Sequence, residues 1–470
     1  MAAPAVSPDY DGDGQADLAM GRPGTDDGGM VYVAFGDGSV QSISGQDLDS
    51  KADGIGAAIA SCDINADGYT DLVLGDSGYE VSAGVTDEGA AHVVYGSSSG
   101  LDADTAQTFT QDSAGVPGLA EKGDQFGAVV ACGTLDSDSY ADIAVASPTV
   151  GVGSKSQAGT VTLLKGSASG TTATGAVLVS QDAPGVPGAA EAADMFGSAL
   201  AIGDLTRDGN QDLAVGSMGE NGDNGLVHVF YGTASGPSLS GATMIGGTGA
   251  GVSGPGQFGE SLAIGGVNRD GVGDLVVGAP AKGSGRVVLL TGAAGGPLSS
   301  ARRKVISQAS SGVPGAAESG DVFGASLAAG DVDGDGDADV VIGAPGEDVG
   351  TAQSAGSVTV MRGGHTPLAS GILVTQDTPG VPGAAEDLDS FGFAVGLVDL
   401  SGDGRLDVAV GAPLEALGGE IFQGMVQVFR GTSTGLSFSD ALTFTSKTFG
   451  DDYGTGAFLG LGLGTRWSQS

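Results

Sequence analysis

The chain has 470 residues, including 90 glycines and 17 prolines, and 40% of its residues are hydrophobic while 16% are charged. Because glycine usually makes up about 7% of a protein, this composition predicts frequent turns around a real core and argues against a disordered segment. The 57 acidic and 17 basic residues give a formal net charge of −40, which excludes a surface that follows nucleic-acid phosphates.

The chain ends and the cysteines bear on where the protein acts. No run of about 18 apolar residues occurs, so we expect no insertion into a membrane. Residues 1–5 lack the charged and apolar regions of a signal peptide and resemble the start of a mature chain. Two cysteines neither prove nor exclude an oxidising compartment. We predict a secreted or extracellular protein.

An aspartate-rich pattern of nine residues occurs seven times, and every copy ends in Asp. The copies are residues 9–17, 63–71, 134–142, 204–212, 266–274, 331–339 and 399–407. Their last positions are 54 to 71 residues apart, which is long enough for about four short strands with turns. Each repeat therefore predicts one small antiparallel sheet.

The sixth repeat shows its strands most clearly, each bounded by Gly, Pro or Asp. They are predicted at Phe323–Gly330, Val340–Ile342, Ser357–Arg362 and Gly371–Thr375, which we name strands A to D. No stretch combines sustained 3.6-residue apolar spacing with a helix cap, so the fold is predicted to be all-β without helices. Closing such sheets into a ring protects their edges, and we predict a single seven-bladed β-propeller spanning residues 1–470.

The two ends of the chain indicate how this ring closes. The first aspartate loop follows the N-terminus directly, without a strand A before it. An additional copy of that segment, from Asp452-Tyr453-Gly454 to Gly464, lies at the C-terminus. We therefore expect residues at about 449–464 to complete the first blade by pairing with the strand after Asp17.

Two further motifs recur in fixed order around the aspartate loops. They are the pairs Phe126-Gly127, Phe196-Gly197, Phe258-Gly259, Phe323-Gly324 and Phe391-Gly392, and the turns Gly278-Ala279-Pro280, Gly343-Ala344-Pro345 and Gly411-Ala412-Pro413. Ile55 and Tyr453 are expected at the Phe position of two other repeats. The order resembles the FG-GAP repeats of integrin α-subunit propellers. The resemblance implies the propeller fold and a non-enzymatic adhesion or protein-binding module. Since the leg and membrane segments of an integrin are missing, we interpret the chain as a bacterial-type, secreted relative.

The aspartate loops have the chemistry of a calcium site. In residues 331–339, side-chain oxygens at positions 1, 3, 5 and 9 and the backbone carbonyl at position 7 can converge on one hard cation. Calcium takes six to eight oxygen ligands, and Gly336 at position 6 permits the sharp turn. An Asp-Gly hairpin without metal would leave several carboxylates repelling one another.

Five loops are predicted to be good calcium sites and two to be weak or degenerate. The ligands of the good sites are Asp9, Asp11, Asp13, Gln15 and Asp17; Asp63, Asn65, Asp67, Tyr69 and Asp71; Asp204, Thr206, Asp208, Asn210 and Asp212; Asp331, Asp333, Asp335, Asp337 and Asp339; and Asp399, Ser401, Asp403, Arg405 and Asp407. The weaker third loop offers Thr134, Asp136, Asp138, Tyr140 and Asp142. The fifth loop begins with Gly266 and retains Asn268, Asp270 and Asp274.

No catalytic centre is predicted. His92 and His228 occupy the same variable position in strand C, and His365 lies in a turn. No nucleophile elbow, phosphate loop or zinc pair is evident. The alternative function is a calcium-dependent carbohydrate-binding lectin, although such pockets usually use aromatic stacking and the chain has one Trp, Trp467.

A repeated Gly-Val-Pro-Gly turn before strand A is followed by Glu121, Glu191, Glu318 or Glu386. This feature is either a rigid turn whose Glu bonds to a neighbouring backbone or a ring of carboxylates on one face.

Since the loops from A to B are predicted to hold calcium, the loops from B to C and from D to A should lie on the opposite face. We expect a protein or glycan to bind a monomeric propeller on that face. The anchors proposed there are Tyr79, Glu80, Glu220, Glu347, Asp348, Glu415 and Phe422.

Cys62 and Cys132 fall on the inner strands of adjacent repeats, on sides that face each other. Either an inter-blade disulfide or two buried free thiols would fit this placement.

Overall fold

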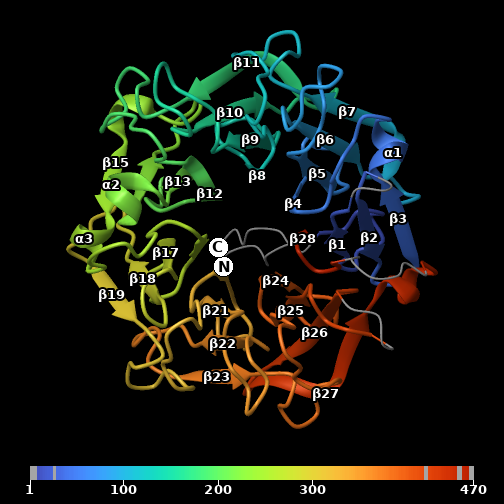
Figure 1. The fold of residues 1–470 in the computed structure, drawn as a ribbon, viewed down its shortest axis with the longest axis vertical. Coiled ribbons are helices and arrows are strands. Elements are labelled where there is room, and N and C mark those ends of the chain that lie inside the picture. Colours follow the sequence, from blue (N-terminus) through green and yellow to red (C-terminus); the bar gives the residue numbers. More distant parts are fainter. Residues whose placement is uncertain (1–7, 25–27, 418–421, 452–457, 465–470) are drawn as a thin grey trace.

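Seven antiparallel sheets of four strands form a ring in the computed structural model, which describes residues 8–24, 28–417, 422–451 and 458–464 (Figure 1). In every sheet the first strand of the blade lies innermost and the later strands follow outward. The predicted all-β, seven-bladed propeller is therefore confirmed.

The strands of every blade run in order from the centre of the ring to its rim. Blade 1 contains β28 (Leu463–Gly464), β1 (Leu18–Arg22), β2 (Met30–Ala34) and β3 (Val40–Ser44); blade 2 contains β4 (Ala58–Cys62), β5 (Asp71–Asp76), β6 (Ala90–Tyr95) and β7 (Asp102–Phe109). Blade 3 contains β8 (Val129–Gly133), β9 (Asp142–Ser147), β10 (Thr160–Lys165) and β11 (Thr172–Val179); blade 4 contains β12 (Phe196–Gly203), β13 (Asp212–Ser217), β14 (Leu226–Phe230) and β15 (Thr243–Gly246). Blade 5 contains β16 (Leu262–Gly265), β17 (Asp274–Ala279), β18 (Arg286–Leu290) and β19 (Arg303–Ile306). Blade 6 contains β20 (Ser326–Gly330), β21 (Asp339–Ala344), β22 (Ser357–Met361) and β23 (Gly371–Val374); blade 7 contains β24 (Ala394–Val398), β25 (Asp407–Ala412), β26 (Met425–Thr432) and β27 (Gly435–Phe444).

Short helical turns connect some of these strands, although the sequence predicts none. They are α1 (Gly45–Leu48), α2 (Glu220–Asp223), α3 (Gly247–Ala250), η1 (Leu239–Gly241) and η2 (Ser446–Phe449). Each has only three or four residues, too few for an apolar period to be visible in sequence. None of the helices in the described part of the chain is long and apolar enough to cross a membrane.

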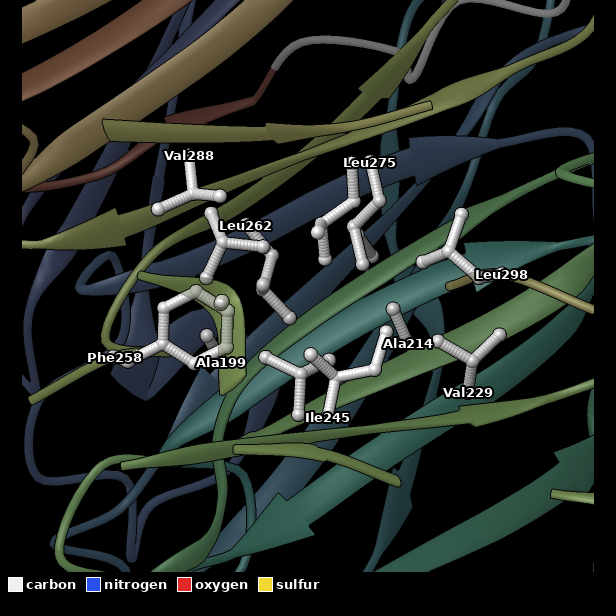
Figure 2. Packing of buried hydrophobic residues seen from close by; sticks show 14 of the residues in the cluster. Ala199, Ala214, Val229, Ile245, Phe258, Leu262, Leu275, Val288 and Leu298 are labelled. Atoms are coloured by element: carbon white, nitrogen blue, oxygen red, sulfur yellow. The ribbon is translucent and has the colours of Figure 1, made fainter. Parts of the chain in front are cut away.

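Hydrophobic cores lie between the blades. Each of the seven buried clusters draws its residues from two neighbouring blades. Figure 2 shows the cluster where Ile245 of blade 4 meets Phe258 and Leu275 of blade 5. Each blade therefore depends on its neighbours to cover its apolar faces, which ties the stability of one blade to the whole ring.

The Phe-Gly and Gly-Ala-Pro motifs meet across these junctions. Phe323 is fully buried between blades 5 and 6 and forms a parallel bridge with Gly285 of blade 5. Strand β20 consequently begins at Ser326, three residues after the predicted start. A Cβ atom on Gly343 would lie 2.1 Å from the carbonyl oxygen of Gly392 in the next blade. Only glycine fits there, which explains why the two motifs recur together.

The C-terminal segment closes the ring as predicted, but in a different register. Strand β28 pairs with β1 through Ala19 opposite Gly464 and Met20 opposite Leu463. The Phe position of this repeat is occupied by Leu459, which is fully buried between blades 7 and 1 and bridges to Gly424. The expected Tyr453-Gly454 pair is thus the wrong equivalent, and it lies outside the described residues. Leu459 precedes the pairing residue Gly462 by three, the spacing that separates Phe323 from Ser326.

The two cysteines form a disulfide between blades 2 and 3. Cys62 ends β4, Cys132 lies in β8, and their Cα atoms are 6.2 Å apart. The alternative of two free thiols is therefore wrong.

Candidate metal centres

The ninth aspartate of every loop is buried where strand B begins. These residues are Asp17, Asp71, Asp142, Asp212, Asp274, Asp339 and Asp407. Asp339 shows the arrangement, since its Oδ2 accepts the Val332 amide at 3.2 Å and its Oδ1 accepts the Gly363 amide at 2.9 Å. The carboxylate thereby fastens the loop between strands A and B to the corner after strand C. Burial raises the pKa of Asp339 to about 7 and the nearby Asp333 and Asp331 carboxylates add to this effect, although the two backbone donors oppose it.

The sixth loop brings its other acidic side chains to the same point. Asp331 accepts the Gly334 amide at 2.7 Å and the Gly336 amide at 2.9 Å, with one bond to each carboxylate oxygen. One carboxylate oxygen from each of Asp331, Asp333 and Asp339 lies within 4.8 Å of the others. Carboxylate oxygens have further lone pairs beyond those used by backbone amides, so this group could hold a hard cation.

The first loop brings a different set together, since carboxylate oxygens of Asp9, Asp11 and Asp13, at positions 1, 3 and 5, lie within 4.8 Å of one another. The second, fourth and seventh loops repeat the bond from the position-6 glycine to the first aspartate. Gly68 donates to Asp63 at 3.1 Å, Gly209 to Asp204 at 3.0 Å and Gly404 to Asp399 at 2.8 Å. Asn65, Thr206 and Ser401 replace the third-position carboxylate in these loops. The predicted carboxylate ligands therefore converge in the first and sixth loops, while the second, fourth and seventh loops share only the glycine-to-aspartate bond with them.

The third loop contains a cation from the protein itself. The Lys165 ammonium, at the end of β10, lies 2.7 Å from Asp136 Oδ2 and 3.0 Å from Asp142 Oδ2. Burial lowers the pKa of Lys165, but the two aspartates outweigh this effect and raise it above its ordinary value. Lys165 is not among the residues predicted for this loop from the sequence. The available signal was a lysine directly before Gly166, where the other repeats carry Phe35, Tyr95, Tyr231, Thr291, Arg362 and Arg430.

The fifth loop uses an amide instead. Asn268 Nδ2 donates to Asp270 Oδ2 at 3.0 Å and to Asp274 Oδ1 at 3.3 Å. An amide nitrogen cannot ligate a cation, and Gly266 provides no side chain at position 1.

On the opposite face, four of the expected partner anchors are buried. Glu220, Glu347 and Glu415 have only 7%, 6% and 5% of their surface exposed, and Tyr79 has 5%. The Nε2 atoms of Gln181, Gln308 and Gln376 donate to these three glutamates. Their prediction as partner anchors is wrong, because each of these glutamates lies buried against a glutamine of the preceding blade junction.

That turn is closed by a hydrogen bond from the Glu backbone, not by the predicted bond of the Glu to a neighbouring backbone. The backbone amides of Glu121, Glu191, Glu318 and Glu386 each donate to an aspartate three residues later, and the Glu318 amide lies 2.7 Å from Asp321 Oδ2. The bond uses the backbone of Glu and leaves its carboxylate available.

Four residues recur with constant spacing at these junctions, and they were not predicted as a group from the sequence. Counting from the glutamine, a Glu follows after 10 residues, an Asp after 13 and the buried Glu after 39. The four residues are Gln181, Glu191, Asp194 and Glu220 at one junction, Gln308, Glu318, Asp321 and Glu347 at the next example, and Gln376, Glu386, Asp389 and Glu415 at the last.

Two of the three histidines, His92 and His228, are buried and take part in hydrogen bonds. His228 is fully buried and its Nε2 lies 2.9 Å from the Pro187 carbonyl of such a turn. In blade 7, Gln427 Nε2 donates to Pro382 O at 2.7 Å from the same strand position. His92 lies 3.5 Å from Asp76, and His365 is exposed.

Comparison with known proteins finds the FG-GAP repeat model at residues 2–34, 196–230, 258–290, 323–361 and 391–429. Integrin alpha-3 of Mus musculus is 36% identical over 139 residues, which cover 28% of this chain and 12% of that protein. Phosphatidylinositol-glycan-specific phospholipase D of Mus musculus is 30% identical over 211 residues, or 43% of this chain and 24% of that protein. The chain thus spans no more than 24% of the length of these relatives. Among solved structures, the exotype rhamnogalacturonan lyase YesX gives a TM-score of 0.44 at 12% identity, covering 87% of this chain and 70% of that one.

Proposed function

We propose that this integrin-α-like FG-GAP propeller binds calcium in its aspartate loops and acts as a secreted, non-enzymatic adhesion or protein-binding module. The FG-GAP matches, the similarity to integrin alpha chains and the seven-bladed ring make it an integrin-α-like FG-GAP propeller. We take residues 1–470 as one such domain. Protein binding follows from that likeness, while calcium, adhesion and secretion are our extension of it.

The observation that carries the calcium assignment is the convergence of carboxylates in the first and sixth loops. These loops offer only oxygen donors from side chains and backbone, and hard cations such as calcium prefer that donor set. The lysine in the third loop supports the same conclusion, because a cation there neutralises the carboxylates at the corresponding place.

The partner is proposed to bind the face formed by the loops from B to C and from D to A. The exposed large hydrophobic residues of the described chain are Val40, Leu119, Val177, Met244, Leu388, Phe393 and Leu442. Leu119, Leu388 and Phe393 belong to loops from D to A, while the other four lie on outermost strands. The described loops on the calcium side contribute none of this set. Exposed apolar side chains on rigid loops are suitable anchors for a protein partner.

A non-enzymatic role is proposed because the described histidines offer no catalytic pair. Because the chain also resembles phosphatidylinositol-glycan-specific phospholipase D, over 24% of that protein's length, phospholipase activity is tested directly. Incubation with a glycosylphosphatidylinositol-anchored protein should release none of it into solution. Release that depends on the intact chain would overturn this part of the proposal.

Binding is tested on protein and glycan arrays with the full chain, with calcium and with chelator. The Leu388→Ser and Phe393→Ser variants should lose a protein ligand, while Leu442→Ser, an equally exposed leucine on β27, should retain it. Binding to glycans alone would favour the lectin. Loss of the ligand in Leu442→Ser but not in the loop variants would place the partner on the rim.

A further inference from the structure

Three carboxylates converge at the junction of blades 5 and 6, on the face away from the aspartate loops. One carboxylate oxygen from each of Glu318, Asp321 and Glu347 lies within 4.8 Å of the others. Glu318 is exposed, whereas Asp321 and Glu347 have 2% and 6% of their surface exposed. The group is therefore open to solvent on one side and closed on the other.

No ion pair among the described residues compensates this charge. The lysine and arginine pairs of the described chain all fall on the aspartate loops at the other face. Burying two adjacent carboxylates without a cation is costly. The site therefore needs either a bound cation or a proton.

A buried glutamine points into the same group. Gln308 has 3% of its surface exposed, and its Nε2 donates to Glu347 Oε2. Its other polar atom, Oε1, has no hydrogen-bond partner. Gly315 of the Gly-Val-Pro-Gly turn covers the pair, since a Cβ there would lie 3.7 Å from Gln308 Nε2 and 4.0 Å from Glu347 Oε1. A half-turn of the amide would present a buried oxygen ligand beside three carboxylates.

The same four residues recur at two other junctions with unchanged spacing. The amide oxygens of Gln181 and Gln376 are likewise buried and without a partner. At the junction of blades 2 and 3, Gln111, Glu121 and Asp124 keep the spacing but Val150 replaces the buried glutamate. Three junctions therefore carry all four residues, and the junction of blades 2 and 3 lacks the buried glutamate.

We propose that Glu318, Asp321, Glu347 and the amide oxygen of Gln308 form a second kind of divalent-cation site, distinct from the aspartate loops. Three carboxylates and one amide oxygen are all hard donors, and calcium accepts such ligands in irregular geometry. The cation would join the turn after blade 5 to the loop from B to C in blade 6. The junctions with Gln181 and Gln376 carry the same residue types, although of the three described junctions only this one brings its three carboxylates within 4.8 Å.

The test counts calcium bound to the full chain after equilibrium dialysis, with metal analysis and a parallel magnesium arm. Glu347→Gln removes the charge but can still accept the bond from Gln308, and it should bind one calcium fewer than wild type. Asp348→Asn is the matched control, because it removes the charge of the next residue, which is exposed and outside the cluster. It should bind the wild-type number.

Asp335→Ala separates this inference from the proposed calcium loops. If Asp335→Ala loses one ion and Glu347→Gln loses none, the junction site is refuted and the loop assignment stands. If Glu347→Gln loses one and Asp335→Ala loses none, the loop assignment fails instead.

Should Glu347→Gln fail to fold, Glu318→Gln replaces it, since the Glu318 backbone and not its side chain holds the turn. An unchanged calcium count in folded Glu318→Gln would then refute the junction site. If magnesium displaces calcium from wild type but not from Glu347→Gln, the junction site is supported and prefers the smaller cation.

Discussion

The sixth and third aspartate loops occupy equivalent places in blades 6 and 3 but differ in what lies against their carboxylates. In the sixth loop, Asp331, Asp333 and Asp339 converge, and Arg362 at the corner after strand C reaches only Asp333, at 3.2 Å. In the third loop, Lys165 at the corresponding corner contacts the third-position and ninth-position aspartates together.

This difference teaches what each part of the loop does. The ninth aspartate is retained in both because it fastens two loops through backbone amides, as Asp142 does with Gly166 at 3.1 Å and Asp339 does with Gly363 at 2.9 Å. We expect the remaining carboxylates to need a nearby cation, because they would otherwise repel one another. We propose that the sixth loop, where Arg362 reaches Asp333 and Arg269 reaches Asp337, still takes further positive charge from an ion in solution. In the third loop, Lys165 supplies this charge.

Chelation provides the largest test of this contrast. A site occupied only in the folded state contributes about 2.7 kcal/mol at a hundredfold excess of ion over Kd, so losing several ions should lower the melting temperature strongly. Hydrogen exchange should accelerate at Gly336 in the sixth loop and stay unchanged at Ser139 in the third. Equal acceleration at both amides would contradict the comparison, and an unchanged melting temperature would contradict calcium binding altogether.

A single substitution at matched positions gives the next largest effect. Asp335→Ala removes the fifth-position ligand of the sixth loop and should cost about 2.7 kcal/mol in saturating calcium and little in chelator. Asp138→Ala, at the same position of the third loop, should cost less than about 0.5 kcal/mol in both conditions, as exposed substitutions usually do. Urea denaturation of both variants, with and without calcium, measures the difference. A larger calcium-dependent loss in Asp138→Ala would reverse the assignment.

The fold was largely predictable because its signals are local and repeated. The aspartate loops, the Phe-Gly pairs and the missing first strand together specify seven blades and their closure. The sequence predicts that the two cysteines face each other, but not whether they form a disulfide, since facing positions permit a bond without requiring one. Leu459 was missed because burial between blades needs only an apolar side chain of suitable size, and an aromatic-glycine pair six residues earlier matched the pattern better.

The contacts that distinguish one loop or junction from another were harder to predict. Lys165 lies 23 residues after Asp142 and 29 after Asp136, so only the folded corner brings them together. The Glu347 and Glu415 carboxylates looked like exposed loop charge, and their burial depends on glutamines 39 residues earlier in the preceding blade. Constant spacing in three copies was the available sequence signal.

Removing the internal cation should turn the third loop into one that resembles the sixth. Lys165→Met keeps the length of the side chain but leaves Asp136 and Asp142 without their donor, which should cost about 2 kcal/mol in chelator. Calcium should then recover part of that loss, and metal analysis should find one additional ion. Lys155→Met, which removes a lysine of the same blade away from the loop, is the control. If calcium stabilises Lys165→Met no more than it stabilises Lys155→Met, the third loop cannot bind calcium even when the lysine is removed.

The smallest expected effect separates acid sensitivity of the scaffold from acid release of calcium. Burial lowers the pKa of His228 to about 4, although its bond to the Pro187 carbonyl opposes the shift. The unfolded chain takes up this proton near pH 6.5 and the folded chain only near pH 4, so stability falls as pH decreases through that window. At pH 5.5 the loss should be about 1 kcal/mol.

The buried aspartates change stability in the opposite direction, so the measured quantity is the difference in unfolding free energy between wild type and His228→Gln in chelator. Glutamine should remove the histidine contribution and keep the bond, because Gln427 donates to Pro382 from the same place in blade 7. His365→Gln, at an exposed turn, should follow wild type, and an equal pH dependence in all three proteins would show that His228 is not the group responsible.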